Sequence, residues 1–401
     1  MLTKEEKKIM GLTIGSHSLV HLFEGVLPPL IPMMIIQFNT DYFHIGLVVT
    51  VFSYAFGLGS LPAGIIADRL GPRRLISMFL FGAGSMAILV WPIQTLWTYG
   101  IIMGFIGLCC STYHPASNTL ISLTMINKGR AFGVHGIAGS LGVACVPLLS
   151  AWIGSIYGWR TPHVIYGIFG IFLGFYSLSV AEHHAKPVGD SGEKIQSVKL
   201  DKKVLFTICI FFLSATALGM TYKGIMTFLP VYMGTRVELS FMNLNIVTLG
   251  GTIATLALAS GAIGQYVAGR LVDRHSAEKL YFGAVFIGMI CVFIMAVSIN
   301  VLLVVAAVIY AFFYFSTQPM QNFLISRYLP PHRQGLGYGI HFFLTFGVGS
   351  TAAAVSGYIA DRFGLETVFI LMGVCFIMAA SLAMILMLRA GEKNKPMKPT
   401  L

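Results

Sequence analysis

Long runs of uncharged, apolar residues leave this chain few ways to fold. Residues 75–127, 131–159 and 280–326 contain no Asp, Glu, Lys or Arg, and about 20 apolar residues are enough for a helix to cross a bilayer. Inside lipid every backbone N–H and C=O must be bonded within the protein, which favours helices for segments of this length. Breaks such as Pro92 and Asn300 divide the longest runs. The pattern predicts an all-α membrane protein with twelve transmembrane helices.

Composition and charge support a membrane protein with both termini in the cytoplasm. The chain is 56 % hydrophobic and 10 % charged, with a net charge of +11, which is too apolar for a soluble globular protein. With cytoplasmic termini, only Arg160, Arg236 and Arg362 fall on the opposite side, and Lys223 lies within a span. Lys and Arg accumulate on the cytoplasmic side of membrane proteins. The positive charge therefore indicates topology in a cell (inner) membrane, and we expect no nucleic-acid partner.

A repeated signature at helix ends shows that the chain is internally duplicated. An apolar run ends in Gly64–Arg74, and related sequences end later runs at Gly269–Arg274 and Gly357–Gly364. Repeats of this kind determine the fold and are sought first. We therefore expect two pseudo-symmetric six-helix bundles, which make up residues 1–181 and residues 204–401 with a short basic tail. The polar residues 182–203 are expected to form a cytoplasmic linker between them.

The helix-end sequence Gly64–Arg74 resembles the G-x-x-x-D-R-x-G-x-R-R loop between helices 2 and 3 of the major facilitator superfamily. This resemblance implies a transporter that works by alternating access around a cavity between two halves, with no cofactor. A membrane enzyme is not expected, because nucleophile–base sets and phosphate-binding glycine loops do not occur in the sequence. The resemblance also implies that the loop and its second-half copy control the conformational cycle. These residues are Gly64, Asp68, Arg69, Gly71, Arg73 and Arg74, with Asp273 and Arg274 in the second half.

A narrower resemblance involves Ser16-His17, Tyr113-His114-Pro115 and a glycine-rich stretch from Gly133 to Pro147. These segments are similar to the fosmidomycin-resistance family of efflux proteins, which implies proton-coupled export (antiport) of a small polar or amphiphilic compound and antibiotic resistance. Gly100 stands where many drug antiporters carry an arginine, so a general multidrug assignment is weakened. Proton-coupled uptake of an organic anion remains an alternative, and transport of a metal or metal chelate is a further one.

Glu24 and Lys223 are charged residues near the middle of apolar spans, at matching places in the two repeats. A lone charge at the bilayer centre costs about 2.5–3.5 kcal/mol on insertion scales, so such residues usually face the bundle interior and find partners. We expect either a static salt bridge or a proton-coupling pair. His17 and His21 fall on the same helix face as Glu24 and complete the candidate proton-coupling set. One helix supplies too few ligands for a metal unless His114, His135 or His341 converge on it, so no metal site is predicted.

Further polar residues recur at matching positions of the two halves, and we expect them to bind the substrate near the membrane midplane. His135 and His341 share a Gly-x-His setting and are predicted to lie on opposite sides of one cavity. The partners expected are a small-molecule substrate, protons and the lipid bilayer, and the protein is expected to act as a monomer. The candidate substrate-binding residues are Tyr54, His114, Asn118, His135, Tyr222, Gln318, Gln321, Asn322 and His341.

Overall fold

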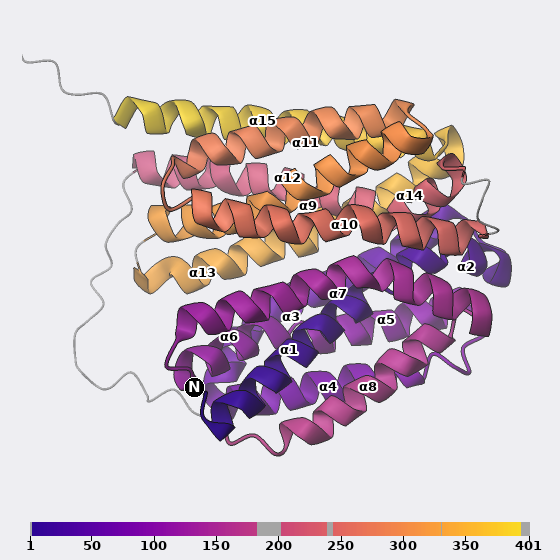
Figure 1. The fold of residues 1–401 in the computed structure, drawn as a ribbon, viewed down its shortest axis with the longest axis horizontal. Helices are drawn as coiled ribbons and strands as arrows, with labels where there is room; N and C mark the ends of the chain where they lie inside the picture. Colours follow the sequence, from indigo (N-terminus) through magenta and orange to yellow (C-terminus); the bar gives the residue numbers. More distant parts are fainter. Residues whose placement is uncertain (1, 183–201, 239–243, 330, 394–401) are drawn as a thin grey trace, which may run out of the picture.

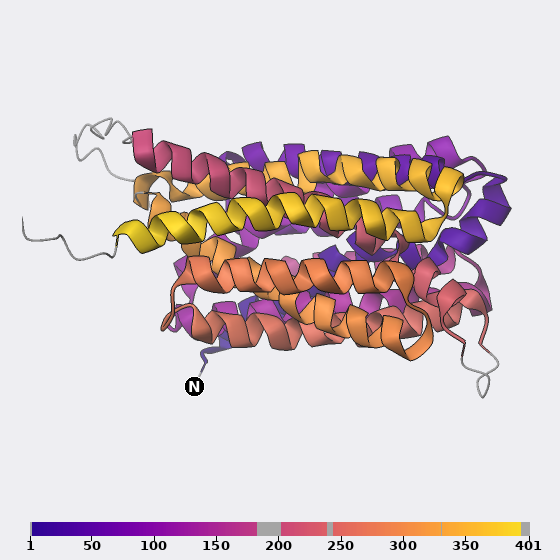
Figure 2. The same cartoon turned by 90° about the horizontal axis from the view of Figure 1, so that it is seen from above.

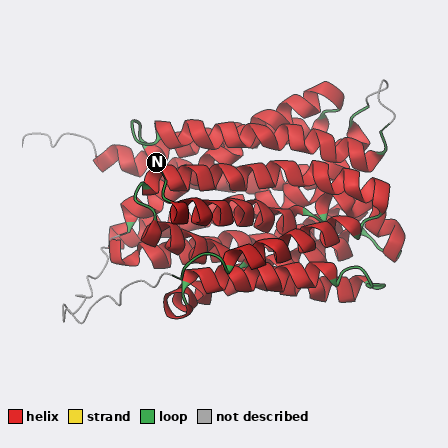
Figure 3. Ribbon diagram, turned by 60° about the horizontal axis from the view of Figure 1, so that its bottom comes forward, coloured by secondary structure: helices red, strands yellow, loops and turns green. Residues whose placement is uncertain are grey.

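The structure, a computed structural model, describes residues 2–182, 202–238, 244–329 and 331–393. All the elements in these ranges are helical, and most run side by side along one axis (Figures 1 and 3). The elements from residue 4 to residue 177 form one half, and those from residue 202 onward form the other (Figure 1). The elements of the first half are α1 (Lys4–Gly25), η1 (Pro28–Leu30), α2 (Ile31–Phe38), α3 (Tyr42–Leu70), α4 (Pro72–Ile88), α5 (Leu96–Cys110), α6 (Tyr113–Thr124), α7 (Lys128–Tyr157) and α8 (Thr161–Ser177).

The second half contains long helices and one irregular segment. A π-helical turn and a 3₁₀ turn interrupt the helix between α13 and α14, and such π turns often occur at functional sites. The elements are α9 (Lys202–Arg236), α10 (Ile246–Leu271), α11 (Ala277–Val297), α12 (Asn300–Tyr328), α13 (Pro331–Phe342), η2 (Phe343–Gly347), η3 (Val348–Ser350), α14 (Thr351–Phe363) and α15 (Leu365–Lys393).

Ten helical segments of the described residues are long and apolar enough to cross a membrane. The two other apolar helices, α4 and α8, have 17 residues each. They are therefore about 26 Å long at 1.5 Å per residue, slightly shorter than the hydrocarbon core of about 30 Å. A multi-pass membrane protein is thus supported, and the count of twelve spans stays a prediction.

The bundle has two distinct ends, which we call the terminal face and the distal face. Helix α1 begins and α15 ends at the terminal face, and the opposite end is the distal face (Figures 1 and 2). Helices α1, α7 and α9 start at the terminal face, whereas α3, α10 and α12 start at the distal face. The level of a residue between the two faces therefore follows from its place in its helix.

The halves are joined near the distal face by close contacts between α3 and the segment η2–α14. The Asp361 carboxylate accepts hydrogen bonds from the backbone N–H groups of Tyr42 (3.0 Å) and Phe43 (2.9 Å). Deeper in the bundle, Thr50 Oγ1 donates to Ser350 O at 3.0 Å. Glycines let the backbones approach, because a Cβ at Gly46 would stand 2.9 Å from Cα of Ala354.

Helices α7 and α10 make the second contact between the halves, where Thr255 Oγ1 accepts from Leu148 N–H (3.0 Å).

The glycine contact gives a direct test of how the distal face is closed. We expect Gly46→Ala to destabilise this arrangement by about 1–3 kcal/mol, the usual cost of overpacking, because the neighbouring atoms are backbone and cannot rotate away. Gly133→Ala on α7 is the matched control, because a Cβ there meets nothing within 4 Å. Thermal unfolding of the purified protein in detergent measures both variants. Equal melting temperatures for the two would contradict the prediction.

Candidate functional site

A buried ion pair connects the two halves at the centre of the bundle. Lys223 Nζ on α9 donates to Glu24 Oε1, in the last turn of α1, at 2.5 Å. The side chains of Lys223 and Glu24 are only 6 % and 10 % exposed. The other carboxylate oxygen accepts a hydrogen bond from His21 Nδ1 at 3.2 Å. The rings of Tyr222 and Phe346 lie 5.6 and 5.3 Å from the ammonium and can stabilise it through cation–π attraction.

Local sequence explains why these two charges meet. Pro28 and Pro29 end α1 shortly after Glu24 and start a 3₁₀ turn, so the carboxylate lies at a bend. Gly25 follows Glu24, and a Cβ in its place would lie 2.5 Å from a Val146 methyl group on α7. The structure therefore contains the ion pair between Glu24 and Lys223 that the sequence predicts.

A cavity of about 170 Å³ lies on the terminal side of the ion pair and has walls from both halves. Helix α1 contributes His17 and His21, and α9 contributes Tyr222, one residue before Lys223 towards the terminal face. Of the nine predicted substrate-binding residues, the structure brings six to this cavity. They are His114, Tyr222, Gln318, Gln321, Asn322 and His341.

The three other predicted residues do not line this cavity. Tyr54 shares a hydrogen bond of 2.7 Å with Thr351 Oγ1, between the halves. Asn118 is exposed on α6. His135 is buried behind His17, because its ring stacks on that of His17 with centroids 4.0 Å apart. The prediction that His135 and His341 face each other across one cavity is therefore corrected, since only His341 lines it.

His114 reaches the cavity because the helix is interrupted before α6. Pro115 has no N–H group to donate to the carbonyl of Ser111, four residues earlier, and α5 ends at Cys110. The hydroxyl of Ser60 donates to this free carbonyl at 3.4 Å. After the turn, His114 lies against α1. Three ring nitrogens, one from each of His17, His21 and His114, lie within 4.8 Å of one another.

Sequence reasoning missed several residues that complete the site. Gln265 on α10 donates to Gln318 Oε1 at 2.6 Å and accepts from the hydroxyl of Ser140 on α7, so it connects the two halves beside the cavity. Tyr314 stacks on Tyr222 with ring centroids 5.4 Å apart. The sequence carried one signal for Gln265, because its amide side chain lies within the uncharged run 239–269. The spacing of the aromatic residues on α12 could not be distinguished from ordinary core packing.

A second, smaller cavity of about 50 Å³ lies beside the ion pair. Its wall is mostly apolar, with Val49, Val146 and Leu258 among the lining residues, and Glu24, Lys223, His21 and Tyr222 also line it. His21 and Tyr222 line both cavities. These two residues and the ion pair therefore form the wall between the large cavity and the small one.

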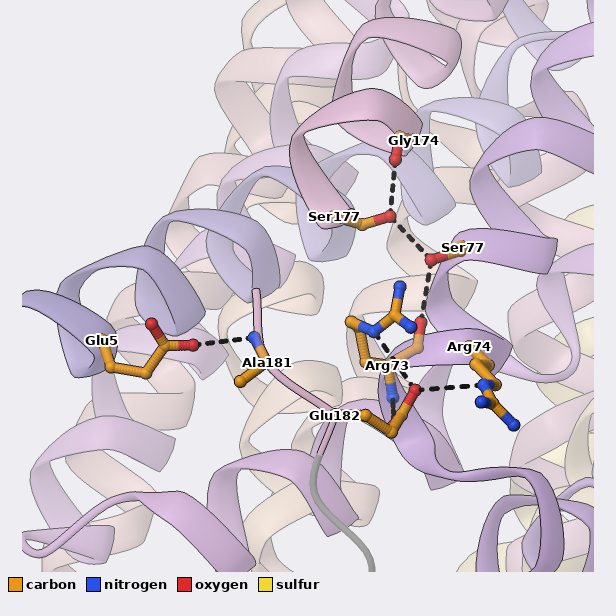
Figure 4. A network of polar contacts seen from close by, with 8 residues as sticks. All are labelled: Glu5, Arg73, Arg74, Ser77, Gly174, Ser177, Ala181 and Glu182. Atoms are coloured by element: carbon orange, nitrogen blue, oxygen red, sulfur yellow. Dashed lines mark hydrogen bonds and ion pairs between the residues drawn. The ribbon is translucent and has the colours of Figure 1, made fainter. Parts of the chain in front are cut away.

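The predicted conformational loop begins at the end of α3, at the terminal face. Its Arg73 and Arg74 contact Glu182 (Figure 4). The Glu182 carboxylate accepts from Arg73 N–H and Nε, both at 3.1 Å, and lies 3.7 Å from Arg74 Nε. Gly71 has φ +90° and ψ 142°, a conformation that favours glycine. The surroundings of Gly64 and the side chains of Asp68 and Arg69 lie outside the described part of the structure. Asp273 and Arg274 are exposed just beyond α10.

The fold and the site define a multi-pass membrane protein whose two halves enclose a cavity lined by polar and aromatic side chains. The sequence profile of the Major Facilitator Superfamily matches residues 13–354 and 247–400. The chain therefore belongs to this superfamily, which confirms the resemblance seen in the loop motif.

Individual relatives agree with this membership. The fosmidomycin resistance protein of Escherichia coli K12 is 21 % identical over 372 residues, 90 % of this chain and 88 % of that protein. A probable L-galactonate transporter of the same organism is 27 % identical over 147 residues, 36 % of this chain. The chain covers 32 % of the length of that transporter. It covers 47 % and 44 % of the length of two other relatives that match over short stretches. An inward-facing bacterial homologue of the human lysosomal transporter Spinster has the same fold, with a TM-score of 0.78, 14 % identity and full coverage of both chains.

The buried ion pair leads to a prediction about stability. Lys223→Ala leaves the Glu24 carboxylate buried without its partner, and we expect a loss of about 3–5 kcal/mol. Arg236→Ala is the control, because its pair with Glu366 is 34 % and 42 % exposed and should contribute about 1 kcal/mol or less. Denaturant titration in detergent measures both variants. The double variant Glu24→Leu/Lys223→Leu should recover stability, and no recovery would contradict this explanation.

Proposed function

We propose that this protein is a secondary active transporter that exports a small polar or amphiphilic compound in exchange for protons. The observation that carries the proposal is the Glu24–Lys223 ion pair, which joins the two halves directly beside a cavity with walls from both. In this proposal the protein acts as a monomer in the inner membrane, and the terminal face is cytoplasmic.

Proton coupling follows from the chemistry of the pair. Two opposite charges in an apolar interior stabilise each other, and removal of one charge leaves the other buried and unpaired. Protonation of Glu24 removes the negative charge and releases Lys223, so the contact between α1 and α9 weakens. The two halves can then rock about the central site, as in other transporters built from repeats. His21, bonded to the same carboxylate, and His17, next to it, offer a path for the proton from the cavity.

The cavity wall suggests the class of substrate. Three amide side chains on α12 offer donors and acceptors, and the stacked rings of Tyr222 and Tyr314 offer an apolar face. Such a mixture suits a small compound with polar groups on an apolar body. The fosmidomycin resistance relative favours export of an antimicrobial compound.

A second candidate is proton-coupled uptake of an organic anion. Lys223 would attract its carboxylate once Glu24 is protonated, and the probable L-galactonate transporter among the relatives favours a substrate of this class. Transport driven by a pH gradient in proteoliposomes separates the two candidates. Efflux substrates and sugar acids are offered in turn, with a pH gradient of either sign. Accumulation of a sugar acid on the side with the higher pH would favour uptake.

Glu24→Gln tests the proton site. The amide keeps the size and an acceptor for Lys223 but has no carboxylate to titrate. We expect accumulation driven by a pH gradient to disappear, while exchange of labelled for unlabelled substrate continues. The control is Glu366→Gln, which removes an exposed carboxylate at the distal end of α15 and should keep coupled transport. Unchanged dependence on the pH gradient in Glu24→Gln would move the proton site to the histidines.

Arg73→Gln tests the loop at the terminal face. We expect equilibrium substrate binding to change by less than about threefold, or about 0.7 kcal/mol, because Arg73 does not line the cavity. Transport should slow strongly, because the side-chain hydrogen bond from Arg73 Nε to Glu182, the first residue of the predicted linker, is lost. Arg74→Gln is the matched control, because Arg74 is 58 % exposed and its contact is longer. A large loss of binding with normal conformational exchange would contradict a gating role.

A further inference from the structure

Three histidines from two helices converge at the edge of the large cavity. His17 and His21 lie one turn apart on α1, and His114 comes from the first turn of α6. Their ring centroids are 5.2 to 5.7 Å apart, and one nitrogen of each lies within 4.8 Å of the other two. Imidazoles gathered in this way suit Zn²⁺, Cu²⁺, Ni²⁺ and similar ions.

The hydrogen bonds around these rings have the form found behind metal ligands. His17 Nδ1 donates to the carbonyl oxygen of His135 at 2.6 Å. His21 Nδ1 donates to the Glu24 carboxylate at 3.2 Å. In both rings Nε2 is therefore the nitrogen that keeps a lone pair. Metal-bound histidines almost always use their second nitrogen in this way, to a carbonyl or a carboxylate, which fixes the tautomer and the ring orientation.

The third ring is positioned by packing. His114 stacks parallel to Phe342 of α13, with centroids 6.1 Å apart and planes 9° apart, and Phe56 lies edge-on to it. It thus faces both halves of the protein. Phe342 and His114 both line the large cavity, so the site has access to whatever the cavity holds.

We propose that His17, His21 and His114 form a three-imidazole site for a divalent transition metal ion, for which Zn²⁺ is the reference. Around a tetrahedral ion with bonds of about 2.0–2.1 Å, neighbouring nitrogens lie roughly 3.3 Å apart, so the rings close by about 1.5 Å on binding. Three protein ligands leave a fourth position, which faces the cavity and accepts water or a donor atom of the substrate. The Glu24 carboxylate acts behind His21 and contributes negative charge near the ion.

Metal binding is tested on untagged, full-length protein in detergent, washed with a chelator and titrated with Zn²⁺ by calorimetry at neutral pH. We expect one ion per chain. His114→Asn should weaken binding at least tenfold, since the ion loses one of three protein ligands. His163→Asn is the matched control, because His163 is a buried histidine of the same half that bonds Tyr99 and Trp159 instead. Its affinity for Zn²⁺ should equal that of the unaltered protein.

A second measurement uses the unaltered protein alone and does not depend on the folding of any variant. Co²⁺ should bind with the intense visible absorption of a four-coordinate, nitrogen-rich site, and Zn²⁺ should displace it. Absence of stoichiometric binding, a weak six-coordinate Co²⁺ spectrum, or equal affinity of His114→Asn and His163→Asn would each overturn the proposal. Since binding is measured at equilibrium, these failures would leave the proposed transport function to its own tests.

Discussion

The contact between Glu24 and Lys223 is the interaction on which the organisation of this molecule depends. Each side chain alone is a charge in an apolar interior, and each becomes tolerable only because the other half supplies its partner. The proline-rich break after α1 and the aromatic rings beside the ammonium serve this contact. Two rigid bundles are thus joined at their centre by an electrostatic bond that a single proton can cancel. A linkage of this kind can be switched, whereas an apolar contact of the same size could not.

The contacts near the distal face are of a different nature. There α3 and α14 approach so closely that glycine is required, and hydrogen bonds such as those of Asp361 hold the helix ends together. Backbone packing of this kind is either fully made or fully lost, because close-packed surfaces do not deform gradually. In the proposed transport cycle, the distal contact and the central ion pair are therefore each expected to be made or broken as a unit. Gly46 in α3 and Gly357 in α14 have this role, because a Cβ at either would meet backbone atoms of the other helix.

Most of the architecture could be predicted from the sequence, and so could the central pair. Apolar runs and the repeated helix-end motif indicate the helices and the two halves, and the matching positions of Glu24 and Lys223 predict their encounter. Rotation of one helix against another could not be predicted, because it depends on packing between distant segments. For this reason His135 lies behind His17, Tyr54 lies between the halves, and His114 joins the histidines of α1. Sequence position shows that these residues are near the midplane, but not which of them face the cavity.

One carboxylate belongs to both the ion pair and the histidine cluster. Glu24 accepts from Lys223 with one oxygen and from His21 with the other, so it balances two donors in a poorly hydrated place. Charge gained or lost on the imidazoles changes the electrostatic energy of the carboxylate, and at short range in a medium of low polarity this change is large. The strength of the bond between the halves must then depend on what the cavity holds. Under the proposed function, reciprocity requires that the affinity of the cavity for a proton or a cation depends on whether the halves are joined. The proposed coupling between occupancy and conformation then needs no long pathway, because the two sites share a residue.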